Sequence, residues 1–265
     1  MTTSKIFFIF IISILLFSCG PSKKERAIEK LQMAHDAYEK GDTTLALLKV
    51  DSVTILYSEE IQQKENAQKF RKQIYGDILF REQDELDTIN SRISKIEKLF
   101  STEKTPYDRY RQYIYKRQDA EKRWNKSYIQ VHLDERGELY ISSNYYGEKW
   151  LNHISLRVYD NDIQSKTDTV PLNSPLNHHS DFLNTKWEKV SYTNGADNGL
   201  IKFIAENADR KLKAVFLGSR YYYIILEDYD KQAMKEALKL SKLLKRKKIL
   251  EKDIKILHEK ANLSH

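Results

Sequence analysis

The first half of the chain has the apolar spacing of α-helices. The earliest run begins near Glu25 and consists of Ile28, Leu31, Ala34 and Tyr38. Gly41 and Asp42 interrupt it, and a second run follows through Leu45, Leu48 and Leu56. Steps of three and four place such residues on one helix face, and glycine followed by aspartate is a turn signal. The pattern predicts two helices that form a hairpin and pack on whatever follows them.

A longer helix is predicted from Glu60 to Phe100, a stretch without proline. Its second half carries an apolar seam with heptad spacing, made of Leu86, Ile89, Ile93, Ile96 and Phe100. A seam of the same period lies near the end of the chain, made of Leu240, Leu243, Leu250, Ile254, Leu257 and Ala261. Left exposed, either seam would be an adhesive stripe. We expect the two seams to pack together as an antiparallel pair within one chain; the alternative is that each meets its own copy in a dimer.

From Tyr128 to Leu226 the apolar period is two, which is typical of strands. Seven short strands are predicted, at residues 129–133, 139–143, 154–159, 163–170, 187–192, 212–217 and 221–226. A short helix from Leu200 to Asn207 interrupts them. Pro171 to Thr185 contains two prolines and is predicted to be a loop. The strands that follow each other across a tight turn are expected to pair as hairpins.

The segment from Lys5 to Gly20 has the layout of a secretory signal. One lysine precedes the apolar run Ile6 to Phe17, and Ser18 stands before Cys19, the chain's only cysteine. The run rises about 18 Å as a helix against roughly 30 Å of bilayer hydrocarbon, so it is too short for a permanent span. Leu16, Ser18 and Cys19 resemble the lipobox of bacterial lipoprotein precursors, whose cysteine receives the lipid. The resemblance implies that Cys19 anchors the protein to membrane lipid.

Together these elements predict an α+β fold: an N-terminal helical hairpin, a long coiled-coil-like helix, a small antiparallel β domain and a C-terminal helix. The expected boundaries are a signal peptide at 1–18, the lipidated cysteine and tether at 19–24, a helical region at 25–127, a β-rich domain at 128–228 and a basic helix at 229–265.

Two further resemblances concern architecture. Ala34, Gly41, Asp42 and Ala46 have the mutual spacing of one tetratricopeptide repeat, in which small residues let two helices approach closely. The chain from residue 19 onward also resembles a group of lipoproteins from Bacteroides-type bacteria. That likeness rests on the lipobox, the helical hairpin with Gly41 and Asp42, the long helix and the strand pair KAVFLGSRYYYIIL before a helix. It implies architecture and location, and it carries over no activity.

The tether after Cys19 bears on which face of the outer membrane the protein occupies. The segment Gly20 to Lys24 lacks the acidic cluster that many surface-displayed lipoproteins of such bacteria carry. The resemblance therefore favours the periplasmic face of the outer membrane over the cell surface.

The formal net charge of +7 comes from one part of the 265-residue chain. Lys231 to His265 holds eleven Lys or Arg and four Asp or Glu, a surplus of seven, so the remainder is neutral. On an exported lipoprotein such a segment is typical of a solvated helix face or of contact with anionic lipid and envelope polymers. We expect no nucleic-acid partner, because the compartment supplies little nucleic acid.

Aromatic and basic residues are interleaved between Tyr107 and Trp124. The candidate binding residues there are Tyr110, Tyr113, Tyr115 and Arg117. Such a pattern can stack on sugars or single-stranded nucleic acid. The structural alternative is that the tyrosines cover an interface between the helices and the sheet, with their hydroxyl groups in water.

Metal ligation is the sharpest enzymatic possibility. His178, His179 and Asp181 could share a site with His132 or His153, but adjacent histidines on a strand point to opposite faces. The chain has no nucleophile elbow, phosphate-cradling glycine loop or cysteine left free of lipid. We expect no metal, no cofactor and no catalytic residue.

The sequence therefore favours a non-catalytic envelope protein that binds or scaffolds another envelope component, either a protein or a polysaccharide, and is held off the membrane by a helical stalk. The alternative is an envelope enzyme, with a metal-dependent site in the loop with His178 and His179 as its sharpest form.

Overall fold

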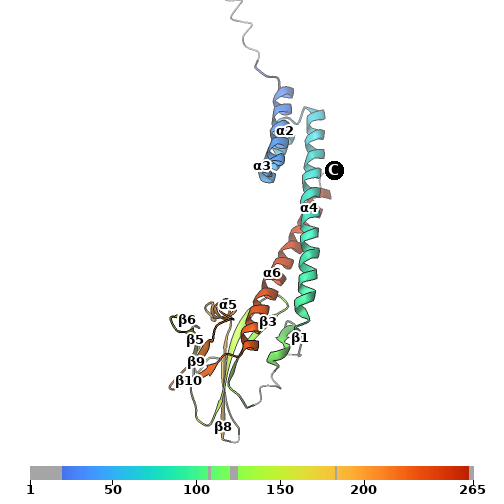
Figure 1. The fold of residues 1–265 in the computed structure, drawn as a ribbon. Coiled ribbons are helices and arrows are strands. Elements are labelled where there is room, and N and C mark those ends of the chain that lie inside the picture. The colour runs from blue at the N-terminus through green and yellow to red at the C-terminus, as the bar shows by residue number, and fades with distance from the viewer. Residues whose placement is uncertain (1–19, 107–108, 120–124, 183, 263–265) are drawn as a thin grey trace, which may run out of the picture. The chain divides into compact units, whose positions relative to one another are not determined.

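A computed structural model describes residues 20–106, 109–119, 125–182 and 184–262 of the chain. It has the expected α+β fold, with a helical hairpin, a long helix, antiparallel sheets and a C-terminal helix (Figure 1). The helices are α2 (Lys23–Glu39), α3 (Thr43–Leu56), α4 (Ile61–Glu97), α5 (Leu200–Glu206) and α6 (Asp228–Asn262), with a 3-10 turn, η1, at Lys116–Gln118. The strands are β1 (Phe100–Glu103), β2 (Gln112–Tyr115), β3 (Tyr128–Asp134), β4 (Leu139–Gly147), β5 (Ser155–Asp160), β6 (Ile163–Lys166), β7 (Asn177–Phe182), β8 (Thr185–Tyr192), β9 (Lys213–Leu217) and β10 (Tyr221–Ile225).

The described residues form two compact units, one from residues 20–84 with 252–262 and the other from those between 85 and 251. The boundaries fall inside α4 and α6, so each of these helices contributes to both units.

In the first unit, α2 and α3 form the predicted hairpin and pack on α4. Ser22 and Glu25 make a reciprocal capping box at the start of α2, and the Asp42 side chain accepts a hydrogen bond from the Leu45 N–H at the start of α3. Gly41 makes the turn at φ +81°, a conformation that side chains disfavour. Ala34 and Ala46 are fully buried where the helices meet, in one cluster with residues of α4 that include Phe70 and Ile74.

The second unit contains two antiparallel sheets. The six-stranded sheet has the order β1-β2-β3-β4-β8-β7, and the four-stranded sheet has the order β10-β9-β5-β6. The predicted hairpins β3–β4, β5–β6 and β9–β10 are all present. The inward residues of both sheets, together with α5 and parts of α4 and α6, form one hydrophobic cluster. This cluster is the hydrophobic core of the second unit.

Both predicted seams contribute to that cluster. Ile89 and Ile93 of α4 and Leu240 and Leu250 of α6 are buried within it. The Arg246 guanidinium donates two hydrogen bonds, of 2.8 and 2.7 Å, to the Glu85 carboxylate, which joins the two helices within this unit. Residues of both seams are therefore buried in the core of this unit, and the pairing of the two seams along their length stays a prediction.

Two predictions of secondary structure are wrong. The sheet begins at Phe100, inside the region from 25 to 127 that was expected to be helical, because α4 ends at Glu97 and β1 and β2 pair with each other and with β3. The predicted loop from Pro171 to Thr185 contains β7, which pairs with β8. The strands concerned are short, as β1 and β2 are, or largely polar, as β7 is, so they have little apolar alternation of their own and form through pairing with a neighbour.

Within the described part of the chain, no helix is both long enough and apolar enough to cross a bilayer.

Candidate functional site

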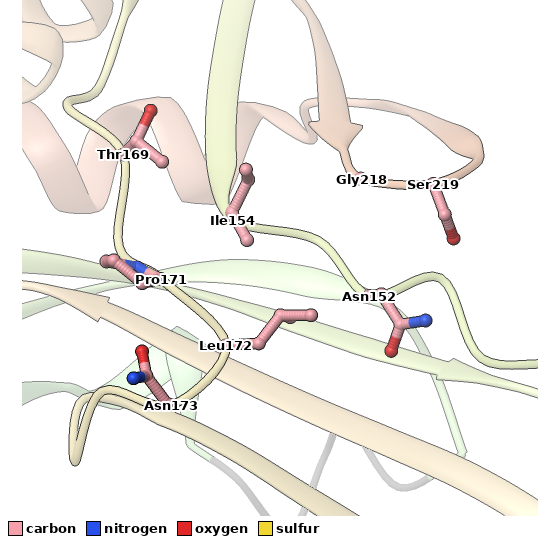
Figure 2. Close-up of a pocket in the computed structure, with 8 residues that line it drawn as sticks. All are labelled: Asn152, Ile154, Thr169, Pro171, Leu172, Asn173, Gly218 and Ser219. Atoms are coloured by element: carbon pink, nitrogen blue, oxygen red, sulfur yellow. The ribbon is translucent and has the colours of Figure 1, made fainter.

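An open groove of about 580 Å³ lies in the second unit, where three segments that join strands come together. Asn152 and Ile154 precede β5, residues 169–173 follow β6, and Gly218 and Ser219 form the turn between β9 and β10. Figure 2 shows the Leu172 side chain extending from its loop toward Asn152 across this groove.

The lining of the groove is neutral. Its apolar part consists of Ile154, Pro171 and Leu172, and Leu172 keeps 48% of its surface exposed. The polar part consists of amides, hydroxyls and backbone groups, and none of the eight lining residues has an ionisable side chain. Such a surface can bind an apolar group and orient it with hydrogen bonds, but it holds no general acid or base.

The turn between β9 and β10 is held against the segment that precedes β5. Ser219 donates to the Leu151 carbonyl through both its backbone N–H, at 3.0 Å, and its hydroxyl, at 2.9 Å. A Cβ at Gly218 would stand 2.4 Å from the same oxygen, so this close approach requires glycine. The turn therefore forms a firm wall of the groove.

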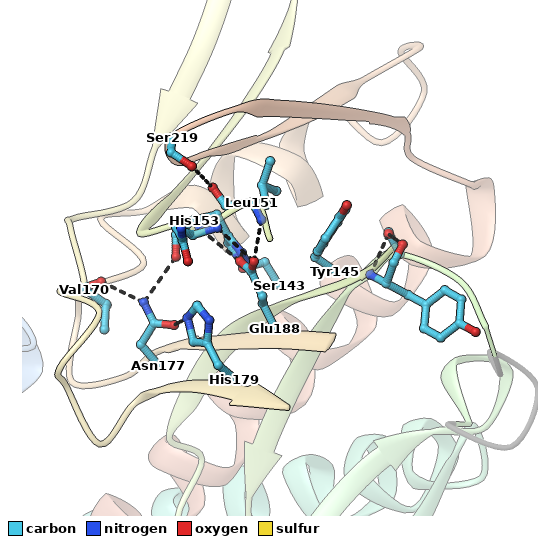
Figure 3. Close-up of polar contacts among 12 residues, drawn as sticks. Ser143, Tyr145, Leu151, His153, Val170, Asn177, His179, Glu188 and Ser219 are labelled. Atoms are coloured by element: carbon cyan, nitrogen blue, oxygen red, sulfur yellow. Dashed lines mark hydrogen bonds and ion pairs between the residues drawn. The ribbon is translucent and has the colours of Figure 1, made fainter. Parts of the chain in front are cut away.

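Behind this wall lies a buried polar network centred on Glu188 of β8 (Figure 3). Its carboxylate accepts hydrogen bonds from the backbone N–H groups of Leu151, Asn152 and His153 at 2.6, 2.8 and 3.0 Å. Asn152 has a φ of +52°, and a left-handed residue in such a run turns successive N–H groups toward one anion. The carboxylate thus fixes the backbone that borders the groove.

The side chain of His153 extends the network. Its Nδ1 lies 2.7 Å from a Glu188 oxygen, and because a carboxylate only accepts, Nδ1 carries the hydrogen. Its Nε2 lies 2.8 Å from the Ser143 hydroxyl of β4, which is itself 3.3 Å from the Tyr192 hydroxyl. Serine, histidine and glutamate therefore stand in the same order as nucleophile, base and orienting acid in a hydrolase triad.

Burial separates this arrangement from a working triad. Ser143, His153 and Glu188 each have 0% of their surface exposed, so no substrate atom reaches the serine hydroxyl. Burial opposes ionisation of Glu188, but the hydrogen bonds from His153 and Asn152 outweigh it and lower the pKa of the carboxyl. Burial also raises the pKa of Tyr192 well above its usual value. The network acts as a structural support for the groove.

Asn177 at the start of β7 joins the network to the other side of the groove. Its amide nitrogen donates to the carbonyls of His153 and Val170 at 3.1 and 3.2 Å, and its amide oxygen lies 2.9 Å from Nε2 of His179. Val170 immediately precedes Pro171 of the groove. Asn177 therefore ties the segment before β5 to the segment after β6.

The histidines and the aspartate considered for the alternative, metal-dependent reading have separate surroundings in the structure. His178 and His179 are successive residues of β7, His179 contacts Asn177, and Asp181 is ion-paired with Lys186. His153 is buried in the network, and His132 stacks on Tyr140 with its ring 4.3 Å away. Over the described residues, no group of three or more His, Cys, Asp or Glu side chains is placed to hold a metal ion.

Two of the four candidate binding residues, Tyr113 and Tyr115, have little exposed surface. Tyr113 and Tyr115 are buried against Phe100, and the Tyr113 hydroxyl donates to Glu97 at 2.7 Å instead of facing water. Burial and this hydrogen bond raise the pKa of Tyr113 to about 12. The guanidinium of Arg136 lies 3.7 Å from the centre of the Tyr110 ring, and that of Arg117 lies 5.5 Å from the centre of the Tyr229 ring.

Cys19, the predicted lipidation site, lies outside the described residues. The residues that sequence reasoning missed are Ser143, His153 and Glu188, which are ten and thirty-five positions apart. Glu188 alternates with buried Val190 and Tyr192 along β8, and a charged residue on the apolar side of a strand was the available signal.

Searches of family models, curated proteins and solved structures find no match to this chain.

Proposed function

We propose that the protein is a non-catalytic binding module of the bacterial cell envelope, anchored to membrane lipid through Cys19. The observation that carries the proposal is the neutral groove beside Leu172, whose lining offers apolar contact and hydrogen bonds but no ionisable side chain. Binding needs only those properties, whereas hydrolysis needs an accessible nucleophile and a proton carrier.

The burial of Ser143, His153 and Glu188 supports this assignment over an acyl-transfer enzyme. A nucleophile has to approach its substrate to about 3 Å, and no surface of Ser143 is open. The metal-dependent alternative at His178 and His179 gains no support from their surroundings, since His179 and Asp181 already contact Asn177 and Lys186.

The groove favours a protein partner over a polysaccharide. Its leucine, isoleucine and proline suit an apolar side chain, and no aromatic ring that could stack on a sugar ring lines it. The amides of Asn152 and Asn173 can orient the backbone of the bound segment. We therefore assign as occupant an apolar segment of another envelope protein.

The proposal is tested by site-specific photo-crosslinking in intact cells. A photoreactive amino acid at Asn173, which lines the groove, should give a defined protein adduct, whereas the same group at Ile249, half exposed on α6, should not. Adding Leu172→Asp should reduce the Asn173 adduct about tenfold or more, because it removes the apolar contact.

The outcomes separate the alternatives. A protease-resistant adduct at Asn173 would identify a polysaccharide partner, which contradicts the choice of a protein. Equal labelling at Asn173 and Ile249, or labelling that Leu172→Asp leaves unchanged, would remove the groove as the binding site.

A further inference from the structure

Strand β10 is an edge of the four-stranded sheet with an unusual composition for an edge. Among the described strands its sole neighbour is β9. Its sequence, YYYII, has no charged residue and no proline, whereas edge strand β6 contains Lys166, edge strand β1 contains Glu103 and β7 is largely polar. Proteins usually protect open edges with charge, proline or short length, and β10 has no such charge or proline.

The side chains on one face of β10 are exposed as a row. Tyr221, Tyr223 and Ile225 keep 65, 55 and 67% of their surface open. The alternate residues are less exposed: Ile224 packs against the core, and Tyr222 keeps 37% of its surface open while its ring lies 5.1 Å from that of Tyr145. An apolar row of this kind beside an unpaired edge suits the addition of another strand.

The hydrogen bonds at both ends of the β9–β10 hairpin show which backbone groups face the open edge. Gly218 N–H donates to the Arg220 carbonyl, and Leu226 N–H donates to the Leu212 carbonyl. In an antiparallel pair, hydrogen-bonded residues alternate with residues whose backbone groups point away. Arg220 and Leu226 bond toward β9, so in steps of two Tyr222 and Ile224 do so as well. The N–H and C=O groups of the residues between them, Tyr221, Tyr223 and Ile225, therefore face the open edge.

We propose that β10 pairs with β10 of a second copy of this chain, antiparallel, on a two-fold axis at Tyr223. This register sets Tyr223 opposite its own copy and Tyr221 opposite Ile225, so every outward residue meets an outward residue. Each of the three pairs exchanges two hydrogen bonds. The exposed side chains of both copies then form one continuous apolar row on the joined sheet.

Charge at the ends of the strand favours a second copy of the same chain as the partner. Arg220 directly precedes β10, and Glu227 and Asp228 follow its end. An antiparallel copy brings the basic start of one strand beside the acidic end of the other, twice in the dimer. A two-fold contact uses the same patch on both chains, as the commonest oligomers do. This inference does not depend on the proposed groove.

Disulfide crosslinking tests the register. In the full chain carrying Cys19→Ser, kept in nonionic detergent, a single cysteine is introduced in place of Tyr223 or, as the matched control, Tyr221. Opposed Cα atoms at Tyr223 would be about 5.5 Å apart, within disulfide range, whereas the two copies of position 221 would be about 13 Å apart along the strands. Copper-phenanthroline oxidation should give a covalent dimer with Tyr223→Cys and little with Tyr221→Cys.

A second pair of variants separates self-pairing from a change in folding. Tyr223→Pro removes an N–H that faces the open edge and leaves the β9 ladder intact, so the dimer dissociation constant should rise at least about tenfold. Tyr223→Val keeps that N–H and should retain the dimer. Light scattering measures both, and circular dichroism checks folding. A parent chain that is monomeric at its highest soluble concentration, or equal crosslinking at both positions, would overturn the proposal.

Discussion

Glu188 is an acidic side chain without exposed surface, and its surroundings explain how the fold tolerates it. Three backbone N–H groups and the His153 ring surround one carboxylate, which is the condition under which a buried charge is compensated. The same contacts fix the backbone from Leu151 to His153, and with it one border of the groove.

Glu188→Gln should therefore be strongly destabilising. The amide nitrogen of glutamine donates where these neighbours also donate, so at least one buried N–H loses its acceptor, at a cost of about 3 kcal/mol in the free energy of unfolding. Glu206→Gln, at an exposed position of α5, should change it by less than about 0.5 kcal/mol. Urea unfolding of both variants measures the difference, and equal stabilities would show that the network contributes little.

The lowered pKa of His132 should make the free energy of unfolding depend on pH. Burial, reinforced by the charge of Lys189, lowers the pKa of its ring to about 3, below the value near 6.5 expected in the unfolded chain. The unfolded chain then binds more protons in that window, so stability is complete above about pH 6.5 and falls as the pH drops toward 3. For one titrating group, the free energy of unfolding changes by at most about 1.4 kcal/mol per pH unit. The change expected for His132 is smaller than this limit, because part of the ring is exposed to solvent.

Two variants isolate this contribution in urea unfolding between pH 4 and 7. His132→Gln keeps a partner for Ser142 but does not titrate, so its stability should depend less on pH than that of the parent. Lys189→Met removes the neighbouring positive charge that helps to lower the pKa of His132. This variant should therefore lose less stability than the parent as the pH falls. A His132→Gln variant with the parent's pH dependence would assign the loss of stability at low pH to other groups.

At the scale of elements, the seams of α4 and α6 offer a matched comparison of adjacent positions. Leu250 is fully buried in the core of the second unit, whereas its neighbour Ile249 is 50% exposed. Leu250→Ala should lower the free energy of unfolding by about 2–5 kcal/mol through lost burial and a cavity. Ile249→Ala should cost less than about 0.5 kcal/mol. Thermal and urea unfolding report both values, and similar losses would mean that the seam is not the buried face.

The strands show how neighbours decide what a short segment becomes. β1 and β2 contain four residues each and pair in register from Phe100 opposite Tyr115 to Glu103 opposite Gln112. Too short to be stable alone, they depend on β3 and on the core beneath Tyr113 and Tyr115. The same aromatic residues that suggested a ligand surface are there packed into the protein.

At the scale of the whole molecule, the proposed lipid anchor at Cys19 would determine where the protein acts. We expect Cys19→Ser to abolish lipid attachment, because Cys19 is the only cysteine and directly follows the apolar run and Ser18. Radiolabelled palmitate should label the parent chain and not the variant. The parent should be found in the membrane fraction that detergent extracts, and the variant should be absent from that fraction. Label that persists on Cys19→Ser would place the lipid elsewhere.

The sequence alone determined the features that depend on neighbours along the chain. Helical spacing located α2, α3, α4 and α6, Gly41 and Asp42 located the first turn, and alternation located hairpins β3–β4, β5–β6 and β9–β10. Each of these is a local preference, repeated over enough residues to outweigh competing conformations. The α+β class followed from the order of the elements.

The tertiary structure alone decided which chemistry is buried and which is accessible. Ser143, His153 and Glu188 come from separate segments and meet only when β4, β8 and the segment before β5 pack together. The groove likewise requires three connections that are remote in sequence. No local pattern encodes such meetings, because they depend on how the sheets pair and pack, and the same packing buried Tyr113 while leaving Tyr223 exposed.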